Sequence, residues 1–363
     1  MSNALADLKI SARIFARSPV NAAIVVTTLA LGIGAATAVF TLVDGVLIQP
    51  LPFSQPEELI SVRHLARDGQ DNVSLSDGLY SLYREQASSI QGIGLYARDE
   101  MNLMVDQEAE QVKVQLATPS FFSVLGAQPA LGRAFLQEEE LPESEPVVIL
   151  SQGFWERVYG GDERVLGKIL EMAGVARRVV GVMPPDFGFP RRDAQAWVPY
   201  QIDPIRNFLT NFQANGVARL ASGSTLETLN VEFQGILSRL GEIFPESGEA
   251  NFLVDVDIRT NNRPLKEEVV GDIGTTLWIL LGTVGLVLLI ACANVANLLL
   301  VRAESRRREL AVRLAMGAGR GQLLSLFMGE SFILSGAGGL LGIFIGTWAL
   351  KISIRFIPTD LPR

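Results

Sequence analysis

The 363-residue chain is poor in cysteine and histidine, with one residue of each, Cys292 and His64. A single cysteine excludes an intramolecular disulfide, and one histidine with one cysteine excludes a His/Cys metal cluster. A Ser-His-Asp triad would have to use His64, which falls in a predicted strand, and the sequence has no G-x-S-x-G nucleophile elbow. We therefore predict no enzyme and no cofactor, and we expect Cys292 to be a buried small hydrophobe.

Charge is also missing from three long stretches of the sequence. Residues 20–43, 275–301 and 331–350 carry no charged side chain over 24, 27 and 20 positions. An apolar run of about 18 or more residues can cross the hydrocarbon core as a helix, which satisfies its own backbone hydrogen bonds. The sequence predicts three transmembrane helices, the third within residues 326–350.

The first apolar run contains Ala36-Thr37-Ala38, which imitates a signal-peptide cleavage site. A cleaved signal peptide is the alternative to a membrane anchor here. The run is longer than a usual signal core and continues past this site, so we interpret residues 20–43 as an uncleaved anchor.

The net charge of −8 is unevenly distributed along the chain. Residues 44–272 hold 34 acidic and 19 basic side chains, whereas residues 1–19 and 302–325 are basic. Short Lys/Arg-rich segments stay in the cytoplasm, which predicts an inner-membrane protein with its N-terminus inside and its main domain outside. Residues 1–19 have amphipathic spacing typical of a helix on the lipid surface. The acidic middle excludes nucleic acid as a partner, because its binders need a basic surface.

Residues 44–272 have the composition of a globular domain. We predict strands at 59–64, 111–117, 146–150, 215–221 and 251–259, and a hairpin of 168–173 with 177–183. Helices are predicted at 77–90, from Pro119 after Thr118, from 152 after Ser151, and from a Ser224/Glu227 capping box to about 244. The fold class is therefore a membrane protein with three transmembrane α-helices and a large α+β domain between the first and second.

Three features of the sequence imitate ligand sites. The segment GDERVLGK, residues 161–168, has five residues between its glycines and Ile169 after the lysine, so it is not a phosphate loop. Gly317, Gly319 and Gly321 lack the spacing and the preceding strand of a dinucleotide loop. The acidic residues 138–140, with Glu143 and Glu145, are interpreted as a solvated loop rather than a cation site.

The Arg-rich segment 302–325 is the candidate functional element. Arg306, Glu309 and Arg313 fall on one helical stripe, with Glu309 and Arg313 as a favourable i,i+4 pair. Leu310 and Leu314 occupy the adjacent stripe. This pattern predicts a short helix along the membrane, and an anchor to lipid headgroups is as compatible with it as a protein-binding role.

Small and polar residues lie within the apolar runs. The first run has a small-residue face that includes Gly32, and Gly338, Gly342 and Gly346 repeat every four residues in the third. Such faces let two helix backbones approach closely. Asn294 and Asn297 share one face of the second run, where we expect hydrogen bonds to a neighbouring helix rather than a transport path.

Several long motifs resemble one known family. The segment GLVLLIACANVANLLLVRAESRRRELAVRLAMGAGRGQLL, residues 285–324, resembles the second span and coupling loop of MacB/FtsX-type ABC transporter permeases. The stretches TTLALGIGAATAVFTLVDGVLIQPLPF, FFSVLGAQPALGRAF, PVVILSQGFWERVYGG and VVGVMPPDFGFP are similar to the MacB periplasmic core domain. Together they look closest to the acidobacterial-type duplicated orphan permeases.

The resemblance implies a permease driven by a separate or fused ABC ATPase, usually as a homodimer or as a pseudo-dimer with a second permease half. It places Arg306, Arg307, Glu309, Leu310, Arg313 and Leu314 at the ATPase contact. ATP-driven motion would then reach the outer domain by mechanotransmission. It also implies a porter-like part near residues 44–115 and 216–272, with a second part inserted between them.

The sequence departs from the family pattern, since neither a fourth span nor a repeat of the unit follows residues 351–363. We therefore expect residues 351–363 to be a periplasmic tail, and the chain to be either a fragment of a longer protein or a truncated gene product. An exporter subunit, a mechanical regulator of a periplasmic enzyme, and an orphan membrane scaffold or sensor remain three functional interpretations.

Overall fold

The computed structural model describes residues 19–66, 73–105, 108–204, 208–271, 273–305, 312, 315–316 and 320–353. The chain forms two compact units, residues 1–49 with 272–358 and residues 50–271 with 359–363. We call them the helical unit and the α+β unit.

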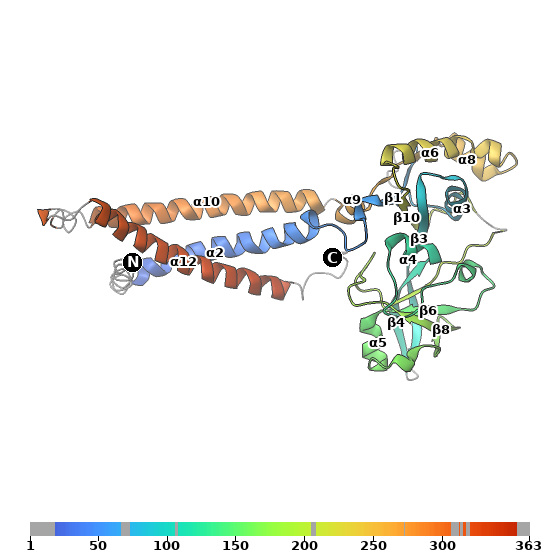
Figure 1. Cartoon of the computed structure of the whole chain (residues 1–363), viewed down its shortest axis with the longest axis horizontal. Coiled ribbons are helices and arrows are strands. Elements are labelled where there is room, and N and C mark those ends of the chain that lie inside the picture. The colour runs from blue at the N-terminus through green and yellow to red at the C-terminus, as the bar shows by residue number, and fades with distance from the viewer. Residues whose placement is uncertain are drawn as a thin grey trace. The chain divides into compact units, whose positions relative to one another are not determined.

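The helical unit contains three long helices, α2 (Pro19–Val43), α10 (Ile273–Ser305) and α12 (Arg320–Ser353). A π-helical turn, η1 (Asp44–Ile48), continues α2. Within the described residues, three segments are long and apolar enough to cross a membrane: Ala22–Ile48, Ile273–Val301 and Ser331–Leu350. The first extends five residues beyond the predicted end at residue 43, because the π-turn prolongs the helix. Helix α2 contacts both α10 and α12, and Figure 1 shows α12 crossing α2.

The α+β unit is built on one mixed sheet. Among the described residues its ten strands follow the order β12-β1-β10-β3-β4-β9-β6-β8-β5, with β7 paired to β3 and β8. The strands of this sheet are β1 (Leu59–Val62), β3 (Ile90–Val105), β4 (Glu108–Ala117), β5 (Leu131–Gly132), β6 (Val147–Leu150), β7 (Ile169–Met172), β8 (Val175–Val182), β9 (Ala196–Pro199), β10 (Asn215–Leu220) and β12 (Arg263–Pro264). A two-stranded sheet joins β2 (His64–Leu65) to β11 (Arg259–Thr260).

Short helices cover the sheet. They are η2 (Pro56–Glu58), α3 (Asp77–Gln86), α4 (Pro119–Leu125), η3 (Gln137–Glu140), α5 (Gln152–Tyr159), η4 (Glu163–Val165), α6 (Leu226–Ser238), α7 (Leu240–Ile243), α8 (Gly248–Asp255) and α9 (Leu265–Val270).

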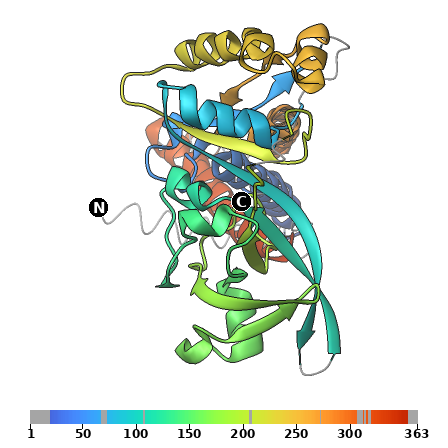
Figure 2. The same cartoon turned by 90° about the vertical axis from the view of Figure 1, so that its right-hand side faces the viewer.

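The long strand β3 divides the α+β unit into two lobes. Its first half pairs with β10 and its second half pairs with β4, and Figure 2 shows β3 and β4 as a long twisted ribbon. The first lobe packs α3, α6 and α8 around an apolar core that includes Leu79, Tyr83 and Phe233. The second lobe comprises β4 to β9 with α4, α5 and η3, and it has a core of its own around Val148 and Phe154. A third core, around Phe121 and Trp197, joins both lobes.

Most predicted elements of the α+β unit are confirmed. The strands at 59–64, 111–117, 146–150 and 215–221 and the hairpin of β7 with β8 are present. Ser151 caps α5, since its hydroxyl accepts from the Phe154 amide. Helix α4 begins at Pro119 as predicted, but the Thr118 hydroxyl accepts from the Leu95 amide instead of capping the helix.

Three local predictions are wrong. Residues 251–259 form most of α8 and the start of β11 rather than one strand, because Ser247 caps a helix there through the Ala250 amide. The predicted helix at 77–90 ends at Gln86, and Ile90 opens β3. The capping box of α6 uses Thr225 and Thr228 instead of Ser224 and Glu227, and the helix is interrupted at Arg239.

Two burial predictions are also wrong. Glu139 and Glu140 are buried rather than solvated, because Glu139 pairs with Arg133, 6 positions earlier, and Glu140 pairs with Arg84, 56 positions earlier. Cys292 is exposed on the surface of α10, because α2 packs against a different face of this helix.

Candidate functional site

The contact between α2 and α12 depends on glycine. A Cβ atom at Gly342 would lie 2.9 Å from the carbonyl oxygen of Ala30, and one at Gly346 would lie 2.7 Å from that of Gly34. At Gly338 the nearest atom would be the Leu29 Cβ, at 2.8 Å. The two helix backbones therefore touch along this stripe, which small residues at four-residue spacing allow.

The opposite side of α2 meets α10 through side chains. Gly32 faces Leu288, whose Cδ1 atom would lie 3.1 Å from an added Cβ. Val295, Leu298 and Leu299 of α10 pack near Val25 and Leu29. Helix α2 thus contacts α10 near Gly32 and α12 near Ala30 and Gly34, and Leu29 takes part in both contacts.

Asn294 and Asn297 lie away from this contact. Both are exposed on α10, beside the apolar exposed residues Ile290 and Val301. In the described residues they pack against no neighbouring helix, so the predicted packing role would require a helix from another chain or segment. A polar side chain facing hydrocarbon without a hydrogen-bond partner is costly.

The predicted ATPase contact lies outside the described residues. This applies to all six of its members, Arg306, Arg307, Glu309, Leu310, Arg313 and Leu314. Of the segment between α10 and α12, the structure describes Val312, Ala315 and Met316, which are exposed. The Met316 amide donates to the Val312 carbonyl at 3.0 Å, as in a helical turn.

The segment that follows α2 and the segment that precedes α10 lie side by side within the α+β unit. Ten residues separate the end of η1 from the start of β1. At the other end of the unit the chain passes through β12 and α9, and two residues, Gly271 and Asp272, separate α9 from α10. Strands β1 and β12 pair antiparallel, Ile60 with Pro264 and Ser61 with Arg263. The first strand after one membrane helix is therefore hydrogen-bonded to the last strand before the next.

Polar side chains reinforce this pairing. The Arg63 Nη2 atom lies 2.6 Å from Glu268 Oε1, and both side chains are mostly buried. Arg263 approaches the same carboxylate at 3.6 Å, and the Asn262 side-chain oxygen accepts from the Arg63 amide at 3.1 Å. We call Arg63, Asn262, Arg263 and Glu268 the junction clamp.

Helix α9 ends on a backbone geometry that suits glycine. Gly271 has φ 48° and ψ −145°, a region that side-chain-bearing residues enter with a strain of about 1–3 kcal/mol. Its amide donates to the Glu267 carbonyl at 2.8 Å, which closes α9 immediately before α10 begins.

Sequence reasoning did not identify the junction clamp. Arg63 and Glu268 stand 205 positions apart, so neither helical nor strand periodicity relates them. The available signal was weak, namely a charged residue within a predicted strand and an acidic residue shortly before an uncharged run.

Two family descriptions match this chain. The MacB-like periplasmic core domain matches residues 22–236, and the FtsX-like permease C-terminal matches residues 281–361. Among its relatives, the macrolide export ATP-binding/permease protein MacB of Chromobacterium violaceum is 26% identical over 239 residues, covering 65% of this chain and 34% of that protein. The protein of the same name from Wolinella succinogenes is 30% identical over 234 residues, covering 63% and 34%. The chain spans about a third of the length of these relatives.

Solved structures of low sequence identity are also similar. The periplasmic region of MacB from Actinobacillus actinomycetemcomitans is 14% identical with a TM-score of 0.44, and the match covers 63% of this chain and 98% of that one. The extracellular domain of the noncanonic ABC-type transporter YknZ is 15% identical with a TM-score of 0.39, covering 56% and 99%. Because the core-domain match takes in more than half of the sequence, this chain belongs to the family of MacB-like permeases with an FtsX-like C-terminal region.

Proposed function

We propose that this chain is the permease subunit of an ABC-type exporter or mechanotransmission complex. A partner ABC ATPase would bind and hydrolyse ATP, and the permease would relay the resulting motion to the α+β unit. Membership of the MacB-like family and three candidate membrane spans support this proposal. The basic N-terminus and the segment between α10 and α12 would lie in the cytoplasm, with the α+β unit in the periplasm.

The junction clamp is the observation that carries the proposal. A motion of α2 or α10 reaches the α+β unit through β1 or through β12 and α9. Because these elements are hydrogen-bonded and joined by the Arg63–Glu268 pair, displacement of one pulls the other. The clamp therefore converts the motion of two separate helices into a motion of the first lobe as a whole.

The ATPase would contact the segment between α10 and α12. We assign this contact to Arg306, Arg307, Glu309, Leu310, Arg313 and Leu314, where charged and apolar stripes adjoin in the sequence. A second permease half would cover Asn294 and Asn297 of α10 and give their amides hydrogen-bond partners.

Affinity capture of the full chain from membranes, followed by mass spectrometry, tests the proposal. We expect an ABC ATPase in the captured complex, and we expect its loss when Arg306, Arg307 and Arg313 are changed to Gln. The matched control changes Arg164, Arg239 and Arg259 to Gln, since these side chains are exposed in the α+β unit. This control removes the same charge and should retain the ATPase.

Two outcomes would contradict the proposal. Capture of the intact, membrane-inserted chain without any ATPase would favour an orphan scaffold or sensor. Capture of an ATPase together with a cell-wall hydrolase, and no substrate export by the complex, would favour mechanical regulation of a periplasmic enzyme.

A further inference from the structure

Helix α3 carries polar groups at regular helical spacing. Asp77, Tyr80 and Arg84 stand at positions i, i+3 and i+7, which brings them onto one side of the helix. Leu79, Leu82 and Tyr83 are buried in the core of the first lobe. Helix α3 thus packs into the first lobe through its apolar side chains, and its polar stripe lies on another side of the helix.

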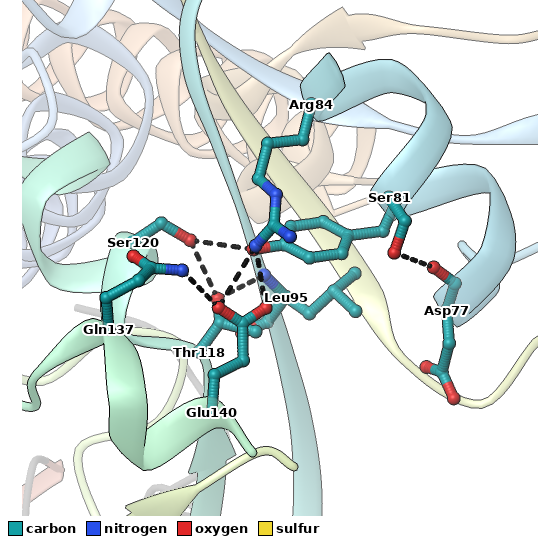
Figure 3. A network of polar contacts seen from close by, with 9 residues as sticks. Asp77, Ser81, Arg84, Leu95, Thr118, Ser120, Gln137 and Glu140 are labelled. Carbon is teal, nitrogen blue, oxygen red and sulfur yellow. Dashed lines mark hydrogen bonds and ion pairs between the residues drawn. The ribbon is translucent and has the colours of Figure 1, made fainter. Parts of the chain in front are cut away.

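Each polar residue of this stripe bonds to a segment outside α3: Asp77 to the chain after β9, Tyr80 to α4 and Arg84 to η3. The Tyr200 hydroxyl donates to Asp77 at 2.7 Å, and the Tyr80 hydroxyl lies 3.1 Å from that of Ser120. Arg84 Nη1 donates to both carboxylate oxygens of Glu140, at 2.9 and 3.0 Å (Figure 3).

Glu140 is the most deeply buried partner. Its side chain is 5% exposed, against 38% for Arg84. The Gln137 side chain donates to the same carboxylate at 2.6 Å, and the Ile202 amide donates to the Glu140 backbone carbonyl at 2.8 Å. A buried carboxylate with charge-assisted bonds is satisfied, whereas the same carboxylate without its arginine is strongly destabilising.

The seam between α3 and η3 is incompletely packed. A cavity of about 410 Å³ lies between Ser81, Arg84 and Glu85 of α3 and the segment 137–141. A second cavity of about 540 Å³ lies on the side of Gln137 that faces α4 and Arg133. Between these two hollows η3 meets α3 through the Arg84–Glu140 ion pair, in contrast to the apolar core that joins the lobes around Phe121.

We propose that α3 and η3 form a reversible latch between the two lobes, closed by the Arg84–Glu140 pair and opened when the relay moves the lobes apart. The latch adds a mechanism to the proposed function, and the opening of the latch rests on that proposed function. The apolar core around Phe121 and Trp197 stays intact during opening and acts as the hinge. Partly solvated ion pairs suit this role, because water replaces their hydrogen bonds when they separate, whereas exposed apolar surface would oppose opening.

Native-state hydrogen exchange on the full chain in lipid nanodiscs tests the latch without any ATPase. The Ile202 amide bonds to the Glu140 carbonyl, and the amides of Glu139 and Leu141 bond to carbonyls within the η3 turn that carries Glu140, so these three amides serve as reporters. In Arg84→Met we expect these amides to exchange roughly tenfold faster, since one charge-assisted contact is lost. The amide of Ala87, bonded to the Tyr83 carbonyl at the end of α3, should exchange at its wild-type rate.

Two further variants separate the latch from a general loss of stability. Arg84→Lys keeps the positive charge and should give an intermediate rate at the reporters. Arg157→Met removes a bidentate arginine contact to Glu110 on the exposed surface and should leave the reporters unchanged. Unchanged exchange at Leu141 and Ile202 in Arg84→Met, or equal acceleration throughout the α+β unit, would overturn the latch.

A second arm tests opening in the complex with the captured ATPase. Addition of ATP should accelerate exchange at Leu141 and Ile202 in the wild type and should add little in Arg84→Met. If ATP does not change the exchange of these amides although Arg84→Met accelerates it, the Arg84–Glu140 pair is a permanent contact. The proposed opening is then overturned. That result would leave the proposed function untouched, because capture of the ATPase tests it independently.

Discussion

The α2–α12 contact and the α3–η3 contact show two opposite ways of holding elements together. In the helical unit, backbone meets backbone at glycine positions, with Gly342 against Ala30 and Gly346 against Gly34. In the α+β unit, an arginine and a buried carboxylate meet beside cavities. The first contact is close-packed and apolar, whereas the second is open and charged.

The difference follows from the surrounding solvent. Hydrocarbon offers helices no hydrophobic reason to associate, so close van der Waals packing is the main source of attraction. Water solvates charges well, so an ion pair at a seam that opens to water exchanges its hydrogen bonds for hydration when it separates. We therefore expect the α2–α12 contact to resist salt and pH, and the α3–η3 contact to respond to salt.

The largest effect is expected from Gly342→Val. A side chain here would overlap Ala30 and Ile33 of α2, and overpacking of this kind costs about 3 kcal/mol. Gly339→Val is the matched control, because an added Cβ at Gly339 meets nothing within 4 Å. Thermal unfolding of the two variants in detergent should show a lowered midpoint for Gly342→Val alone. Equal midpoints would mean that the backbone contact contributes nothing to stability.

A smaller effect is expected from Arg63→Met in the junction clamp. The change leaves the mostly buried Glu268 with Arg263 at 3.6 Å, so we expect a loss of about 2 kcal/mol. In the captured complex, ATP hydrolysis should continue while ATP no longer accelerates exchange at Leu141. Arg164→Met removes an exposed pair and should change neither quantity. Retained ATP-driven acceleration in Arg63→Met would show that motion bypasses the clamp.

The smallest effect concerns Glu232 of α6. Burial raises the pKa of this carboxyl, but hydrogen bonds from Ser88 and Ser89 outweigh burial and lower the pKa to about 2. Because the pKa is lowered in the folded state, the carboxylate contributes stability at pH values above its ordinary pKa near 4.5. This stability is lost as the pH falls toward 2. The carboxylate keeps solvent contact, so screening limits the contribution to about 1 kcal/mol.

Thermal unfolding between pH 6 and about pH 3 measures this contribution. Glu232→Gln should lower the midpoint at pH 6, because the stabilising carboxylate is absent. It should also reduce the loss of stability on acidification, because no carboxylate remains there to be protonated. Glu246→Gln, at an exposed position near α8, should follow the wild type. Parallel curves for wild type and Glu232→Gln would show that this carboxylate does not couple pH to stability.

Local sequence signals predicted elements well where one short segment decides the outcome. The uncharged runs yielded three helices, and β6, β7 and β8 lie where alternation and apolar content placed them. The errors fall where a distant partner decides. Glu140 reads as part of a solvated acidic run, yet it is buried because Arg84, 56 positions away, supplies the opposite charge.

Local sequence signals were enough to predict the membrane spans, the α+β character of the domain between them and the glycines at four-residue spacing in α12. These properties arise from local hydrophobicity and periodicity, which neighbouring residues set. The tertiary structure alone decided that β1 pairs with β12, that Arg63 meets Glu268, and that α3 meets η3. Each of these contacts joins residues far apart in the chain, and their pairing is selected by the sheet order and the shared cores rather than by any signal within one segment.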